Sequence, residues 1–244
     1  MKLRTLLPSF LVAMAATTAS AATITYDFRD GSSTPSTVNN SNPGNIFTFT
    51  LNGVTATVTA WSLTGANSTF QASTGYRWSP GMGICSATEG INCSSPEHQV
   101  DNNGGVEMFL IQFSSPVDPM SVRIQPVGGG TSGYDTDVTY YQGTTAAGLN
   151  LAGKNLSQLA ALGFGSAVNN DSTKSTSARD VSIPGGAVTS LLFGARVGGD
   201  AYPDYFKLVS LTADCSPTAT PEPATFAMVG VVLLFAGFAR RKKA

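Results

Sequence analysis

The chain has 244 residues, a formal net charge of −1 at pH 7, 42% hydrophobic residues and 12% charged residues. Its two ends hold six of the fourteen Lys and Arg residues, so residues 22–220 contain eight cations against fourteen Asp and Glu, a net charge of −6. A surface with so few cations argues against nucleic acid or anionic lipid as a partner.

The first 21 residues are typical of a secretory signal peptide. Lys2 and Arg4 form a basic start, residues 6–16 form an apolar run, and small residues lead to Ala21. The alternative is an uncleaved membrane anchor, which the polar residues 17–20 disfavour because they leave the apolar run too short to span a bilayer. We expect cleavage after Ala21, and hence export.

A β-hairpin is the clearest prediction in the region that follows. Apolar and polar residues alternate over 46–51 and again over 54–60, and Asn52-Gly53 stands between them. Asn-Gly is the pair that tight two-residue hairpin turns favour. Further strands are predicted by alternation at 23–28, 68–72, 136–142, 188–196 and 204–212.

Residues 106–113 are apolar on both faces and therefore predict a central strand. Residues 120–127 alternate, and a turn at Ser115-Pro116 is predicted to join the two segments. One segment, 155–163, has a helical pattern, with a cap at its start and a glycine at its end. Many strands and few helices predict an all-β domain over 22–215, a single antiparallel β-sandwich with jelly-roll-like connections.

The three cysteines are Cys85, Cys93 and Cys215. Because export places thiols where they oxidise, we predict a Cys85–Cys93 disulfide that closes a loop of about nine residues. Cys215 is then left beside the linker at 216–220. The alternative pairs Cys215 with one of the other two cysteines.

Acidic residues near loop ends suggest a metal site. Asp101 and Glu107 bracket a loop, Asp135 and Asp137 stand two residues apart, and Asp204 lies in the PDYF stretch. Carboxylate oxygens suit calcium, so Asp101, Glu107, Asp135 and Asp137 are the candidate ligands. The alternative is that Asp101 and Asn102-Asn103 cap turns and the other side chains face water.

Aromatic residues suggest a surface on which sugar rings stack. The candidates for such a glycan-binding platform are Tyr76, Trp78 and Tyr134. Trp61 is expected to pack in or against the core, and Tyr140 and Tyr141 must point to opposite faces of one strand.

No catalytic motif is present in the sequence. His98 is the single histidine and lies in a polar stretch, where a solvated loop position is expected. GxSxG, HExxH, P-loop and CxxC patterns are absent. We therefore expect no enzymatic activity and no cofactor other than the candidate calcium.

The carboxyl end combines three features. Pro221-Glu222-Pro223 is followed by residues 224–239, which carry no charge and as a helix cover about 24 Å of a hydrocarbon layer about 30 Å thick. The tail 240–244 then supplies Arg240, Arg241, Lys242 and Lys243, which orient the segment with its carboxyl end in the cytoplasm.

This order of features resembles the PEP-CTERM sorting signal of Gram-negative bacteria, found on exported proteins handled by the membrane enzyme exosortase. The resemblance implies that exosortase recognises residues 221–223 and that the processed chain passes from the inner membrane to the cell surface or matrix. The alternative is a simple tail anchor that no enzyme processes. A weaker resemblance to PEP-CTERM β-sandwich proteins, which supports the fold alone, covers 78–86, 99–117, 135–143 and 190–213.

The expected function is that of an exosortase-sorted surface or extracellular-matrix protein. Its role would be structural or adhesive, in association with exopolysaccharide or a biofilm, and without nucleic acid. The alternative from another class is a glycan-binding module, and a secreted hydrolase comes third.

Overall fold

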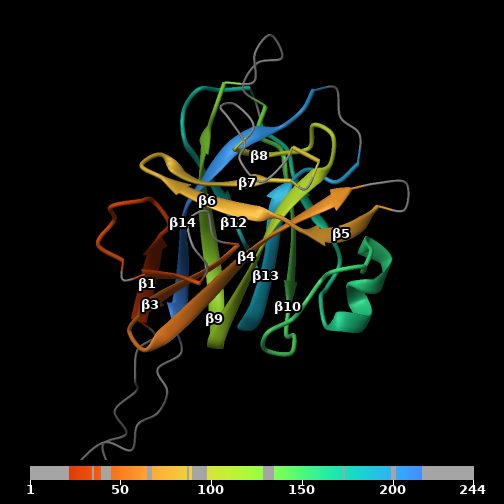
Figure 1. Cartoon of the computed structure of the whole chain (residues 1–244). Coiled ribbons are helices and arrows are strands. Elements are labelled where there is room, and N and C mark those ends of the chain that lie inside the picture. Colours follow the sequence, from red (N-terminus) through yellow and green to blue (C-terminus); the bar gives the residue numbers. More distant parts are fainter. Residues whose placement is uncertain are drawn as a thin grey trace, which may run out of the picture. The chain divides into compact units, whose positions relative to one another are not determined.

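The computed structural model in Figure 1 describes residues 22–34, 36–39, 45–64, 68–86, 88–89, 98–128, 135–172, 174–198 and 202–215. All of these residues belong to one compact unit, Ala22–Ser216. Among them there is no helix long and apolar enough to cross a bilayer. Predicted features that lie outside the described residues are the signal peptide 1–21, Cys93, Tyr134, the linker 216–220, the motif 221–223, the segment 224–239 and the tail 240–244.

The described part of the chain is all-β, as predicted. Short runs rich in Val, Ile, Phe, Tyr and Thr suit the pleated, half-buried surface of a sheet. The strands are β1 (Ala22–Asp27), β2 (Ser36–Asn39), β3 (Ile46–Leu51), β4 (Val54–Thr64), β5 (Thr69–Ala72), β6 (Thr74–Trp78), β7 (Gly81–Cys85), β8 (Val100–Asp101), β9 (Val106–Pro126), β10 (Val138–Gly143), β11 (Val168–Asn170), β12 (Arg179–Ser182), β13 (Val188–Ala195) and β14 (Tyr205–Cys215).

The predicted hairpin is confirmed by β3 and β4. Their antiparallel register runs from Ile46 opposite Thr59 to Leu51 opposite Val54. Asn52 and Gly53 form the turn with φ angles of 48° and 76°. Left-handed φ at both positions is what a type I′ turn requires, which is why Asn-Gly predicted the hairpin correctly.

One continuous antiparallel sheet connects the described strands, in place of the two separate sheets of the predicted sandwich. Its main path runs β11-β10-β13-β9-β14-β7-β6, and the remaining strands attach along it. Figure 1 shows β4 and β6 crossing in front of β9, β13 and β14. Buried residues of β3 and β4 share one hydrophobic cluster with residues of β9, β13 and β14, so parts of the folded sheet pack on one another. The predicted jelly-roll connections are not confirmed.

Strand β9 is the reason that the sheet is continuous. Its first part pairs with β4 and β13, and its second part pairs with β14 and β12. The predicted turn at Ser115-Pro116 is wrong, because the chain bends there without reversing. Pro116 has no N–H to give to a ladder, and the β13 register shifts from Gln112 to Val117 across this point.

Side-chain alternation gives the sheet two buried faces. Tyr140 belongs to the main hydrophobic cluster and Tyr141 to a second one, so their predicted opposite orientation is confirmed. Trp61 lies in the second cluster and is 6% exposed, as expected for a core residue. Leu159 and Phe164 cover that cluster from the loop before β11.

The predicted helical segment forms two three-residue 3-10 turns, η2 (Leu156–Gln158) and η3 (Ala160–Leu162). The expected caps are both present: Asn155 and Gln158 form a capping box, and Gly163 ends the segment with φ 97°. Each turn is too short to continue as an α-helix, and 3-10 geometry is common in connectors of this length.

Truncating β9 in the core should be far more costly than truncating it at the surface. Ile111 is 0% exposed, whereas Met120 on the same strand is 46% exposed. We expect Ile111→Ala to lower the free energy of unfolding by about 2–5 kcal/mol, and Met120→Ala to change it by about 0.5 kcal/mol or less. Urea denaturation of both variants measures the two free energies of unfolding. Similar losses would contradict the role of β9 as the buried central strand of the sheet.

Candidate metal centre

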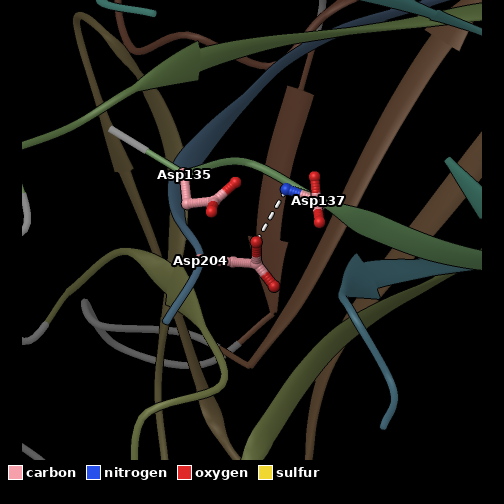
Figure 2. A group of neighbouring side chains, drawn as sticks. All are labelled: Asp135, Asp137 and Asp204. Atoms are coloured by element: carbon pink, nitrogen blue, oxygen red, sulfur yellow. Dashed lines mark hydrogen bonds between the residues drawn. The ribbon is translucent and has the colours of Figure 1, made fainter. Parts of the chain in front are cut away.

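Three buried carboxylates come together at one end of the sheet. Asp135, Asp137 and Asp204 each offer an oxygen, and these oxygens all lie within 4.8 Å of one another. Their exposed fractions are 8%, 7% and 0%. Figure 2 shows that the three side chains converge from two chain segments, those that lead into β10 and β14.

Backbone pairing explains why these two segments meet. The amide of Tyr205, the first residue of β14, donates to the carbonyl of Asp135 at 2.9 Å. The amide of Asp137 donates to Asp204 Oδ1 at 2.6 Å, the bond drawn in Figure 2. The two segments are therefore joined by hydrogen bonds as well as by proximity.

Asp204 has further donors on its second oxygen. Oδ2 accepts from Asn102 Nδ2 at 2.7 Å and from the Arg196 amide at 3.0 Å. The Asp204 amide in turn donates to Asn102 Oδ1 at 2.9 Å. The side chain of Asn102 thus bonds to both the backbone and the side chain of Asp204.

The other two aspartates bond to the loop after β11. Asp135 Oδ1 accepts from the Thr136 amide at 3.0 Å and from Ser172 Oγ at 3.3 Å. Asp137 Oδ1 accepts from the Ser172 amide. The alternative, that these side chains face water, is therefore wrong, because each is buried and hydrogen-bonded.

Two arginines balance part of the negative charge. Arg196 Nη1 lies 3.5 Å from Asp137 Oδ2 and also forms an ion pair with Asp171. Arg179 donates to the Thr136 carbonyl at 2.6 Å. Burial lowers the pKa of Arg179, and the nearby carboxylates, Asp137 first, oppose that shift.

The chemistry of this donor set fits a hard cation. Calcium takes six to eight oxygen ligands from carboxylates, carbonyls and water, and three clustered carboxylates provide a core for such a site. The same contacts also work without a metal, because N–H donors and arginines satisfy most of the carboxylate oxygens. The arrangement thus has the ligand chemistry of a calcium site, and its hydrogen bonds also tie three chain segments together.

Two of the four predicted ligands do not belong to this group. Asp101 accepts from the Asn103 amide at 2.9 Å, which confirms the alternative that it caps a turn. Glu107 lies on β9, is 1% exposed, and accepts from the Asp101 amide at 3.1 Å. Burial first, and then the carboxylates of Asp101 and Glu89, raise the pKa of Glu107 well above 4.5.

Two of the three predicted platform aromatics are stacked on each other. The rings of Tyr76 and Trp78 lie 4.9 Å apart with an interplanar angle of 17°. The ring centroids of Trp78 and His98 lie 4.3 Å apart, and Lys207 Nζ lies 4.2 Å from the ring centroid of Trp78. The indole of Trp78 therefore already has three neighbours, Tyr76, His98 and Lys207. The solvated position expected for His98 is wrong, because its ring packs on Trp78.

The cysteines agree in part with the prediction. Cys215 is a free and buried cysteine at the end of β14, so the alternative that pairs it with another cysteine is not supported. Cys85 is disulfide-bonded. Cys93 lies outside the described residues, and no disulfide joins two described residues. The Cys85–Cys93 pair stays a prediction.

Replacing Asp204 should weaken the domain even without a metal. In Asp204→Asn the new amide loses one acceptor oxygen, which leaves a buried N–H unsatisfied, so we expect a loss of about 1–3 kcal/mol in the free energy of unfolding. Asp180→Asn is the matched control: Asp180 is 57% exposed, and its pair with Arg123 has little influence. Thermal melts in chelator measure both, and equal effects would contradict the structural role of Asp204.

Comparison with known proteins identifies the carboxyl end of the chain. No curated protein and no solved structure matches the sequence. Residues 219–243 match the family described as the PEP-CTERM protein-sorting motif. This is the segment that contains Pro221-Glu222-Pro223 and the basic residues, so the resemblance drawn from those residues is confirmed. The chain carries a PEP-CTERM sorting motif, which implies export and processing by exosortase, and the part of the chain that the structure describes is all-β.

Proposed function

We propose that the protein is a surface or extracellular-matrix component whose β-domain has a structural or adhesive role. The sorting motif at 219–243 carries this proposal, because such a motif sends an exported chain to exosortase. The signal peptide expected at 1–21 is consistent with it. In the mature protein the all-β domain would be the part that meets the matrix, with exopolysaccharide as its candidate partner.

A role without catalysis is part of the proposal. His98 is the only histidine in the chain, and its ring lies against Trp78. Nucleophilic mechanisms of the Ser-His-Asp type need a histidine that bonds a nucleophile and an acid together. The contacts of His98 favour a packing role for this residue.

Calcium is the proposed stabilising cofactor of the β-domain. Asp135, Asp137 and Asp204 would hold it, and the ion would fasten the starts of β10 and β14 together. Exported proteins meet calcium concentrations that suit weak sites built from few carboxylates. Arg196 is the residue that would have to move or share Asp137 when the ion binds.

Processing is the first test. Intact-mass analysis of protein released from the cell surface should show a chain that starts near Ala22 and lacks residues 240–243. Pro221→Ala with Pro223→Ala should leave full-length protein in the inner membrane, because proline favours the extended backbone that a protease-like groove accepts and alanine does not. Pro217→Ala, outside the matched residues, is the control and should be processed normally. Mature protein that still ends at Ala244 would contradict the proposal.

Calcium is the second test. The full chain should melt at a higher temperature in millimolar calcium than in chelator, because a ligand that binds the folded state adds about 2.7 kcal/mol at a hundred times its Kd. Asp135→Asn with Asp137→Asn should abolish the difference, whereas Asp180→Asn should keep it. An unchanged melting temperature of the unaltered protein would leave the three aspartates with a purely structural role.

A further inference from the structure

A buried lysine stands close to the acidic centre but outside it. Lys207 lies on β14, is 4% exposed, and donates through Nζ to the carbonyl of His98. Its Nζ also faces the ring of Trp78 on β6. Strand β7 passes directly over this contact, because a Cβ on Gly83 would lie 1.9 Å from the His98 carbonyl oxygen and 2.8 Å from Lys207 Nζ.

A buried glutamate is attached to the same segment from β9. Glu107 Oε2 accepts from the amide of Asp101, and its other oxygen, Oε1, is buried as well. A carboxyl group this far from water is costly to ionise. Lys207 and Glu107 are thus two buried ionisable groups whose polar atoms engage one short stretch of chain.

Other bonds also hold that stretch, residues 98–101. The amide of Ile84 donates to the Gln99 carbonyl at 3.1 Å, and β8 pairs with the first two residues of β14. The next residue is Asn102, which bonds Asp204 in both directions. Residues 98–101 are therefore connected to the acidic centre through Asn102 and through the pairing of β8 with β14.

We propose that Lys207 and Glu107 form a proton-controlled latch that holds residues 98–101 on β14 and β9 and so steadies Asn102 against Asp204. The ionisable groups around the latch are Asp101 of β8, Glu89 of the turn after β7, and His98. The aromatic wall comes from Tyr76 and Trp78 of β6. The latch acts whether or not the acidic centre holds a cation.

The two groups respond to pH in opposite directions. Burial lowers the pKa of Lys207 from 10.5 to about 7, and Glu107 opposes that shift. The contribution of Lys207 to the closed latch is thus complete above pH 10.5 and is lost as the pH falls to about 7. The pKa of Glu107 is raised above 4.5, so its contribution is complete below pH 4.5 and is lost as the pH rises through the folded-state pKa.

Single variants separate these two responses. In Glu107→Gln only Lys207 of the pair can titrate, so protection of the 98–102 amides from hydrogen exchange should rise between pH 7 and 10. In Lys207→Met only Glu107 of the pair can titrate, so the same protection should fall as the pH rises from 5 to 8. The double variant should show neither slope, and Asp180→Asn should match the unaltered protein.

Hydrogen–deuterium exchange of the full chain in chelator measures this, with rates corrected for intrinsic exchange and compared with a β13 peptide. Because the chelator removes calcium, the exchange rates test the latch alone. If calcium does not bind to the three aspartates, the expected exchange rates stay the same. If Lys207→Met does not fold, Lys207→Arg removes the titration and keeps a charge, and it should also lose the lysine slope. Slopes of the same sign in both single variants, or slopes equal to that of the double variant, would overturn the proposal.

Discussion

The long strand β9 is the constraint on which the rest of the molecule depends. It gives its first part to β4 and β13 and its second part to β14 and β12, so neither edge is left open over most of its length. A strand in this position fixes the register of four neighbours at once. The acidic centre follows from it, since β10 is placed by β13, and β13 and β14 are both placed by β9.

Much of this sheet could be predicted from local pattern. Alternation found β3, β4, β10, β13 and β14, and the Asn52-Gly53 pair fixed a hairpin. The path of β9 could not be predicted, because Ser115-Pro116 is equally typical of a turn and of a bend. Strands β6 and β7 were also missed, since glycines such as Gly81 and Gly83 usually indicate turns, whereas here they let β7 pass close to β14 and the His98 segment.

The acidic centre shows the same limit on a smaller scale. Asp135 and Asp137 were found because they are near in sequence, and the tight bond from Asp137 to Asp204 joins residues 67 apart. Asp101 and Glu107 are near in sequence as well, but β8 and β9 direct them to another buried cluster. Arg179, Arg196 and Asn102 gave no sequence signal, because their contacts depend on long-range register. Backbone N–H donors and these arginines offset the cost of burying three carboxylates.

The segment that a comparison identifies, residues 219–243, follows the β-domain in the sequence and is not part of it. The sorting motif implies export and processing by exosortase, and in the function that we propose the β-domain, with its buried aspartates, is the part delivered to the surface. The most direct measurement is the location of the β-domain in producing cells with and without an active exosortase. We predict that the domain reaches the surface only when the enzyme is active, and that otherwise the full-length chain collects in the inner membrane. Equal amounts of surface-exposed domain in both strains would contradict it.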